Sequence, residues 1–489
     1  MDDVIQLHKG DMSDNGQITI VDEDRLCYVV LSESRGASGL RTISKAILEE
    51  FVEFVKSKPD TAPREAREAL SGQSKIDKYE YGYESTILQM AKMVLGKVSV
   101  IHTIKTKPSH QFFHCRGNFM PYLTALRTKP FMLLAGISGT GKSRIVREMA
   151  KACWKERDPE YGKNHPKNFC MVQVKPNWHD SSELIGYVSR LNGEKFVVGP
   201  FLRFLAAALK EPEVPYFLCL DEMNLAPVEQ YFAEYLSVIE SRKLNPDGTI
   251  TTDPIIEYEN TDAYGSLIDQ LFDTPEERKA YKTDEGGKRL TIPQNLFVVG
   301  TVNMDETTFS FSRKVLDRAM TIEMNEVDLH GGLERGAGNE IGYFGNSIIG
   351  DAAEGCDIYE DNHELCDQVL AYLAQVNAIL EGTPFKIAYR TRNEFLMYAV
   401  NRKKLDEKSQ LWQSLDEMTS MKILSRIEGD EERTKKVLEG LKTLVKEQIV
   451  DKIGENADGT SALPGSISAT KIDEMLAKLK ATGFTSYWA

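Results

Sequence analysis

The sequence predicts an α/β protein in which helices flank a parallel β-sheet. Between residues 130 and 325, short apolar runs alternate with stretches of helical periodicity, and each run ends in a polar or glycine-bearing turn. Such alternation is typical of parallel strands that are buried on both faces. The expected strands are Phe131–Ala135, Phe169–Val174, Tyr216–Leu220 and Leu296–Val302.

Composition narrows the class of protein further. The chain has 489 residues, of which 41% are hydrophobic, and a formal net charge of −14. This charge argues against a surface coated with basic side chains for nucleic-acid binding. The seven cysteines form no C-x-x-C pair, which favours a reducing compartment. The acidic, polar start lacks the features of a secretion signal, and no long apolar run is present. We therefore expect a cytoplasmic protein without a membrane span.

Shifts in composition divide the chain into four parts. The first is a small α+β region, in which two short strands precede a helix over Ile43–Ser57, and it is a candidate for docking a partner or DNA. The α/β domain follows, with a polar interruption at Asn245–Leu290. A segment rich in glycine and acid then leads to a helical C-terminal region, which we expect to form a lid. The expected bounds are 1–115, 116–325, 326–365 and 366–489.

The strongest motif follows the first strand directly. Gly136-Ile-Ser-Gly-Thr-Gly-Lys142-Ser143 matches the pattern G-x-x-x-x-G-K-[ST] and precedes a helix over Arg144–Trp154. Glycines let backbone N–H groups surround phosphate oxygens, and a helix N-terminus favours negative charge. A chance match in a glycine-rich turn is the alternative, and the strand–loop–helix context argues against it. The residues expected to bind nucleotide here are Gly136, Ser138, Gly139, Thr140, Gly141, Lys142, Ser143 and Arg144.

An acidic pair ends the third apolar run. Asp221 and Glu222 follow Tyr216–Leu220 directly, and ligands of α/β proteins bind at the carboxyl ends of the strands. We expect Asp221 to hold Mg²⁺ together with Ser143, and Glu222 to act as the general base for an attacking water. A helix N-cap is the structural alternative, and the phosphate motif about 80 residues upstream favours the catalytic interpretation.

Further polar residues are candidates for the same reaction. Asn303 ends the fourth run and is expected to position the water, although a turn-forming asparagine is an alternative. Arg318, or less favourably Arg313, is expected to reach the γ-phosphate of a neighbouring copy, where arginine stabilises transition-state charge. A solvated helix face is the competing interpretation of both. Arg390 or Arg392 is expected to contact nucleotide from the lid.

In this order, the motifs resemble those of AAA+ ATPases, and more narrowly of the McrB-like branch of modification-dependent restriction systems. The matching stretches are Leu220–Ala226, Gly300–Thr308, Phe311–Arg318, Pro176–Asp180 and Leu184–Tyr187. The resemblance implies a hexameric ring with nucleotide between subunits. It also implies an McrC-like partner that inserts in the ring and carries a nuclease, with DNA contacted through the complex.

One departure from the family bears on the nucleotide. The best-studied branch prefers GTP and carries Met-Asn-x-x-Asp-Arg, whereas this chain has Val302-Asn-Met-Asp-Glu-Thr307 without that arginine. We therefore expect ATP rather than GTP, with Mg²⁺. The triplet Glu277-Arg278-Lys279 is interpreted as a chance match to a nuclease motif. The alternative functions are a MoxR-like chaperone that remodels a partner and a nucleotide-gated scaffold.

Overall fold

The computed structural model describes most of the chain in two separate units. It describes residues 18–23, 27–34, 37–44, 119–191, 193–282, 287–303, 311–325, 341–455 and 465–488, with Leu48, Val52, Ile87, Met90 and Ala91. The units are Met1–Ser109 and His110–Ala489. Part of the glycine-rich segment and the stretch after Asn303, both considered above, lie outside these residues.

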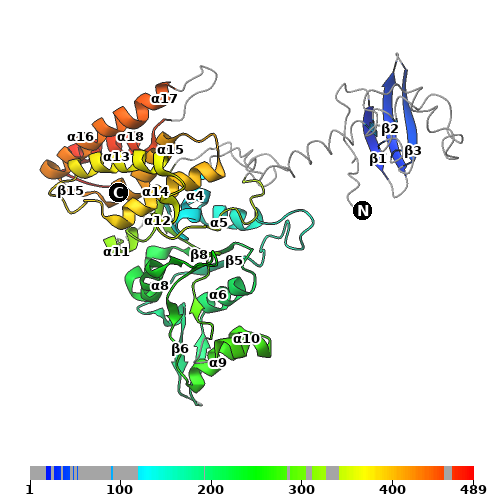
Figure 1. The fold of residues 1–489 in the computed structure, drawn as a ribbon, viewed down its shortest axis with the longest axis horizontal. Helices are drawn as coiled ribbons and strands as arrows, with labels where there is room; N and C mark the ends of the chain where they lie inside the picture. Colours follow the sequence, from blue (N-terminus) through cyan, green and yellow to red (C-terminus); the bar gives the residue numbers. More distant parts are fainter. Residues whose placement is uncertain are drawn as a thin grey trace. The chain divides into compact units, whose positions relative to one another are not determined.

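The N-terminal unit contains a three-stranded antiparallel sheet (Figure 1). Its strands, paired in the order β1-β2-β3, are β1 (Ile18–Glu23), β2 (Cys27–Ser34) and β3 (Ala37–Ser44). The first two were predicted. The third was not, and it includes Ile43, where the predicted helix begins. That helix start is wrong because Ile43 pairs with Tyr28 of β2. Most of the remaining helix lies outside the described residues.

A five-stranded parallel sheet forms the centre of the second unit. Its strand order is β14-β4-β13-β8-β5, and three of the strands are almost wholly buried. This confirms the predicted sheet and its four strands, to which β14 is added. The strands are β4 (Phe131–Gly136), β5 (Phe169–Gln173), β8 (Tyr216–Asp221), β13 (Leu296–Asn303) and β14 (Met320–Glu323).

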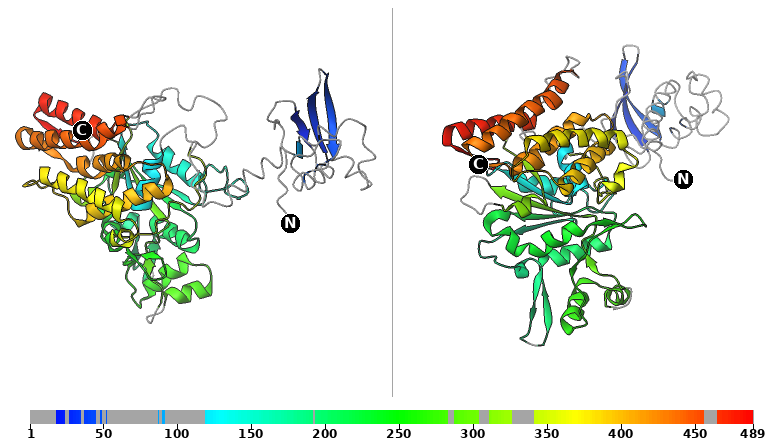
Figure 2. Two further views of the ribbon diagram at one scale, coloured as in Figure 1. Left: turned by 45° about the horizontal axis from the view of Figure 1, so that its top comes forward. Right: turned by 60° about the vertical axis from the view of Figure 1, so that its left-hand side comes forward.

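Alternate side chains of β4 enter two different cores. Met132 and Leu134 pack with α4, α5 and the C-terminal helices, whereas Phe131 and Leu133 pack with α6 and α8. The sheet is thus covered on both faces, as Figure 2 shows, and this burial explains the unbroken apolar runs. The covering helices are α4 (Met120–Thr128), α5 (Lys142–Lys151), α6 (Pro200–Lys210), α7 (Val228–Tyr231) and α8 (Ala233–Val238).

Two insertions extend from the core on the α6 side. A hairpin of β6 (Gly186–Ser189) and β7 (Lys195–Val198) lies beside α9 (Asp262–Leu271), and α10 (Pro275–Tyr281) follows (Figure 1). The second insertion was predicted to be merely a polar interruption, but α9 buries five residues on one face. Short elements complete this region: η2 (Ser181–Glu183), η3 (Met223–Leu225), η4 (Ile239–Ser241), β9 (Lys243–Leu244), β10 (Ile250–Thr251), β11 (Pro254–Ile256), β12 (Leu290–Thr291) and α11 (Arg313–Leu316).

The C-terminal region is helical, as predicted, and shares one hydrophobic core with α4 and α5. Near the end of the chain, β16 (Phe484–Ser486) pairs with β15 (Glu428–Asp430) in a two-stranded antiparallel sheet. In the described part of the expected linker, Ile341, Phe344 and Ile348 are buried in this core. The helices are α12 (Cys356–Tyr359), α13 (His363–Ile379), α14 (Tyr389–Leu405), α15 (Leu411–Met418), η5 (Thr419–Ile423), η6 (Leu424–Arg426), α16 (Glu431–Val445), η7 (Lys446–Val450), α17 (Asp451–Glu455) and α18 (Ile467–Thr482). Among the described residues, no helix is both long and apolar enough to cross a membrane.

The buried side chain of Asn168 forms hydrogen bonds with three residues from different segments of the chain, which leads to a stability prediction. The Asn168 amide donates to the carbonyl oxygens of Ala150 and Pro215, and it accepts from the Trp154 indole. Asn168→Ala leaves these groups unpaired in the interior, so we expect a loss of about 2 kcal/mol in unfolding free energy. Urea denaturation measures it. Asn164→Ala, at an exposed position nearby, serves as the control, and equal stability of the two variants would contradict the assignment.

Candidate nucleotide-binding site

The phosphate loop has a backbone that requires glycine. Gly139 and Gly141 have φ values of 85° and 86°, a region that side chains with a Cβ disfavour. A Cβ on Gly136 would collide with the carbonyl oxygen of Met324. The loop then enters α5, whose first residue is Lys142. The backbone N–H groups of the loop therefore lie between a strand and a helix N-terminus, the arrangement that is typical of an anion-binding site.

The charged and hydroxyl residues of the loop lie at the start of α5. The Lys142 ammonium is buried and donates to the carbonyl oxygens of Gly136 and Ile137 at 2.9 and 2.7 Å. Ser143 is half-buried, and Arg144 is exposed in the same helical turn. Lys142 thus folds back over the loop, where a phosphate group would meet it.

The acidic strand end meets the phosphate loop directly. The Ser143 hydroxyl donates to Asp221 Oδ1 at 2.5 Å, although the two residues are 78 positions apart. Parallel pairing brings them together: β13 pairs with both β4 and β8, and Asn303 lies opposite Gly136. The loop, the acidic pair and Asn303 therefore share one edge of the sheet, as the sequence predicted.

Thr301 connects the carboxylate of Asp221 to the backbone of Glu222. This buried residue donates to Asp221 Oδ1 at 2.8 Å and accepts from the backbone N–H of Glu222 at 3.0 Å. Sequence reasoning missed it, because a threonine suits any strand. The available signal was its position two residues before Asn303, which places both side chains on one face of β13.

Glu222 has a strained backbone. Its φ of 53° and ψ of 50° are left-handed, and it is the one non-glycine residue with positive φ among those that the structure describes. Such conformations cost free energy and cluster at functional sites. The amide of Asn303 lies 3.5 Å from Glu222 Oε1, at the long limit of a hydrogen bond. The carboxylate of Glu222 thus points toward Asn303 and remains half-buried.

The donor set beside the phosphate loop fits a hard cation. The hydroxyl of Ser143 and the carboxylate of Asp221 lie in direct contact, and Mg²⁺ prefers oxygen ligands of this kind. No group of three or more His, Cys, Asp or Glu side chains among the described residues is arranged as a metal site. Two protein oxygens suit Mg²⁺, which usually shares its remaining positions between waters and substrate phosphates.

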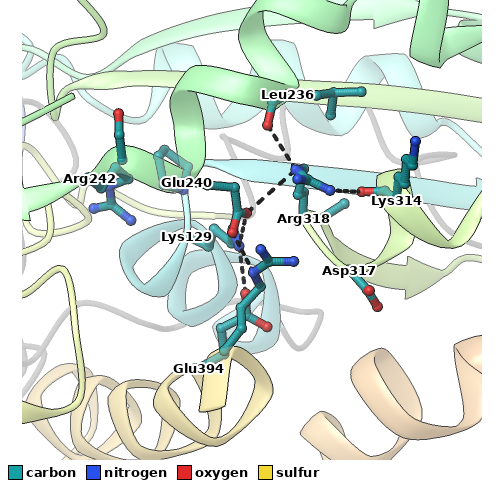
Figure 3. A network of polar contacts seen from close by, with 12 residues as sticks. Lys129, Leu236, Glu240, Arg242, Lys314, Asp317, Arg318 and Glu394 are labelled. Atoms are coloured by element: carbon teal, nitrogen blue, oxygen red, sulfur yellow. Dashed lines mark hydrogen bonds and ion pairs between the residues drawn. The ribbon is translucent and has the colours of Figure 1, made fainter. Parts of the chain in front are cut away.

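Arg318 lies at the opposite edge of the sheet. It directly precedes β14, whose first residue, Met320, pairs with Met132 near the start of β4. The phosphate loop follows the far end of β4, four residues beyond Met132, which is about 13 Å away at the usual rise of a strand. Arg318 donates to the carbonyl oxygens of Leu236 and Lys314, each at 2.8 Å (Figure 3). It therefore cannot serve the phosphate loop of its own chain.

Arg390 was expected to contact nucleotide from a lid, and the structure does not place it beside the phosphate loop of its own chain. Arg390 forms an ion pair with Glu240, which also lies 3.2 Å from the ammonium of Lys129. Lys129 precedes β4, so Arg390 belongs to the edge opposite the phosphate loop. The reason is that α14 packs against α4, which leads into β4.

The other two candidate arginines are not brought to the loop either. Arg392 lies against the ring of Tyr389 and donates to Asn393. Arg313 is exposed, stacks over Phe385 and lies 3.6 Å from Glu428. These neighbours belong to the C-terminal region.

The nuclease-like triplet has a structural explanation. The Glu277 carboxylate and the Thr274 hydroxyl cap each other's backbone N–H groups in a capping box that starts α10. A glutamate in this position is typical of helix starts. This geometry supports the interpretation of the triplet as a chance match.

Comparisons with known proteins agree with the geometry of the site. Residues 131–256 match the AAA domain family (dynein-related subfamily), and residues 348–484 match a domain of unknown function, DUF8727. The chain is 24% identical over 212 residues to the type IV methyl-directed restriction enzyme EcoKMcrB subunit of Escherichia coli K12. This match covers 43% of the chain and only 38% of that relative.

A solved structure from Cytophaga hutchinsonii, described as an ATPase, is 14% identical with a TM-score of 0.35. It covers 70% of this chain and 91% of that one. The matches to the AAA family and to the restriction subunit, with the observed strand order, support an AAA+ α/β domain similar to the McrB-like type.

The bridge formed by Thr301 yields a prediction about catalysis. Thr301→Val keeps the volume but removes the hydroxyl between Asp221 and Glu222. Because hydrogen bonds to charged groups contribute about 1.5–3 kcal/mol, we expect nucleotide turnover to fall roughly ten-fold or more. Nucleotide affinity should change little. Steady-state hydrolysis and binding of a fluorescent nucleotide measure both.

A matched control lies on β14, the strand at one edge of the same sheet. Thr321 of β14 is fully buried, and its hydroxyl has no hydrogen-bond partner within the described structure. Thr321→Val should therefore leave turnover unchanged. If the two variants slow hydrolysis equally, the loss reflects packing rather than the bridge.

Proposed function

We propose that this McrB-like AAA+ ATPase hydrolyses ATP, rather than GTP, where copies of the chain meet in a ring. In this proposal the ring has six copies and drives a separate, McrC-like nuclease subunit of a restriction or antiphage defence complex. The observation that carries the proposal is the contact between Ser143 and Asp221. It joins the phosphate loop to the acidic strand end and leaves Glu222 beside both.

Each residue at this edge of the sheet has a separate role in hydrolysis. The loop N–H groups and Lys142 hold the β- and γ-phosphates, as in other phosphate loops. Ser143 and Asp221 hold Mg²⁺, which when bound neutralises charge on the phosphate oxygens. Glu222 accepts a proton from the attacking water, and Asn303 orients that water. The water oxygen bonds to the γ-phosphorus while the bond to the bridging β-phosphate oxygen breaks, releasing diphosphate nucleotide and phosphate.

Arg318 completes the site from a neighbouring copy. Its distance from its own phosphate loop supports action in trans, because a ring brings the far edge of one copy to the loop edge of the next. A trans arginine stabilises the charge that develops in the transition state. Arg313 is the less favoured candidate, because its partners Phe385 and Glu428 hold it against the C-terminal region.

The identity of the partner rests on the similarity to the restriction subunit. The triplet at Glu277 caps the start of α10, and the similarity to one subunit of a restriction enzyme favours cleavage by a separate chain. DNA cleavage is therefore assigned to another chain, with DNA contacted through the complex. The sequence between Val302 and Thr307, which lacks the arginine of the GTP-preferring branch, supports ATP.

Removing the base should separate binding from turnover. Glu222→Gln keeps the size and the polar contact to Asn303 but cannot accept the proton. We expect turnover to fall at least ~10²-fold, the range of a positioned general base, while nucleotide still binds. Phosphate release and nucleotide binding report the two quantities. Near-normal turnover in this variant contradicts the role of Glu222.

Nucleotide choice and assembly can be tested on the unmodified chain. We expect faster hydrolysis of ATP than of GTP, and a nucleotide-dependent increase in molar mass toward a hexamer. Parallel hydrolysis assays and light scattering with and without nucleotide measure both. Stimulation by a nuclease partner and DNA supports the restriction role, whereas stimulation by an unrelated client protein alone supports a chaperone. A chain that stays monomeric with every nucleotide refutes the ring.

A further inference from the structure

One buried lysine of the C-terminal region holds the turn that carries Arg318. Lys422 lies in η5, and its side chain is only 1% exposed. Its ammonium donates to the carbonyl oxygens of Leu316, Asp317 and Ala319 at 3.3, 3.1 and 2.9 Å. These carbonyls precede and follow Arg318 in the chain. Lys422 therefore fixes the backbone from which the arginine side chain extends.

The charge of Lys422 is balanced inside the protein. Its ammonium lies 2.8 Å from the carboxylate of Glu394, which lies 2.6 Å from Lys129. Burial alone disfavours the charged carboxylate, but the two ammonium groups outweigh this effect and lower the pKa of Glu394. A buried charge is tolerated only when it is paired in this way. Burial lowers the pKa of Lys422 and the Glu394 carboxylate opposes this shift, so the cluster supplies the Lys422 donor with a charged partner beside the Arg318 turn.

Other contacts restrict the same turn from neighbouring elements. Arg426 of η6 forms an ion pair with Asp317 at 3.1 Å. The guanidinium of Arg318 is directed by the carbonyl oxygens of Leu236 and Lys314, and it lies 3.8 Å from Glu240 (Figure 3). The backbone of the turn is therefore set by the C-terminal region, and the side-chain direction by the α/β domain.

We propose that Lys422 is a positioning residue for Arg318 and that the C-terminal region thereby sets how well one copy activates the nucleotide site of the next. This inference rests on the proposed trans role of Arg318. Lys422 itself is remote from nucleotide, so its effect passes through the 316–319 backbone. An arginine that acts across an interface needs such support, because an error of about 1 Å in a positioned group can reduce rate by roughly 10²-fold.

The first test removes the ammonium and keeps an unbranched side chain. Lys422→Met alone should lower kcat by roughly 10- to 100-fold, the range of a misplaced catalytic group. KM for ATP and binding of a fluorescent nucleotide should change little, because the phosphate loop is untouched. A rise in KM with unchanged kcat would overturn the inference.

Mixing of variants gives the decisive test. Arg318→Ala retains its phosphate loop and lacks the arginine, whereas Glu222→Gln retains the arginine and lacks the base. Their mixture should recover hydrolysis at those interfaces where an intact loop meets an intact arginine. Lys422→Met should behave like Arg318→Ala: it recovers when mixed with Glu222→Gln and does not recover when mixed with Arg318→Ala.

The outcomes separate the two proposals. If Arg318→Ala and Glu222→Gln fail to recover together, the trans role of Arg318 is refuted, and the inference about Lys422 falls with it. If that pair recovers but Lys422→Met with Glu222→Gln does not, only the inference is overturned. Recovery of Lys422→Met with Arg318→Ala overturns it as well.

Two further variants guard against simple loss of folding. Arg426→Gln removes the ion pair with Asp317 from a side chain that is 12% exposed. It should give the same mixing pattern with a smaller loss of kcat, so it decides the matter if Lys422→Met does not bind nucleotide. Lys386→Met, which breaks an exposed ion pair with Glu381 in the same region, is the matched control and should leave hydrolysis unchanged.

Discussion

The parallel register of β4, β13 and β8 is the constraint on which the site depends. Because Asn303 lies opposite Gly136 and Gly300 opposite Leu220, three strands deliver their polar ends to one edge. The phosphate loop, the acidic pair and the asparagine thus meet without any long side chain having to span the sheet. The same register sends the start of β14, and Arg318 with it, to the other edge. A single arrangement of strands therefore places the phosphate loop and the acidic pair at one edge and Arg318 at the other.

The edge of the sheet that carries the phosphate loop contains backbone strain, which the buried strands must hold. Glycines accept the left-handed backbone of the loop without a steric penalty, but Glu222 adopts such a conformation with a full side chain. The hydroxyl of Thr301 fixes the Glu222 amide, and the buried β8 and β13 fix Thr301 in turn. A residue held away from its relaxed conformation needs such a framework, and β8 and β13, which supply it here, are almost wholly buried.

Features that depend on neighbouring residues could be predicted from the sequence. Features that depend on contacts between distant parts of the chain could not. Strands buried on both faces are visible as apolar runs, and the phosphate loop is visible because its glycines and lysine are neighbours in the chain. β14 was missed because it has only four residues, too few to show a period. α9 was missed because its apolar face is short and lies among acidic and polar residues, so no helical period stood out from the surrounding sequence. The place of Arg390 depends on how α14 packs against α4, and no local pattern contains that information.

Lys422 shows most clearly what a sequence cannot reveal. A lysine in a polar context is normally solvated, yet this one is buried because Glu394 and three carbonyl groups receive it. Buried ion pairs are weak sources of stability, since desolvation offsets much of the attraction between charges. The cluster of Lys129, Glu394 and Lys422 is better explained by geometry: it links the start of β4, α14 and η5 to one turn. Because charged groups in the interior have few alternative partners, such a link resists displacement. It ties the C-terminal region to the turn that carries Arg318.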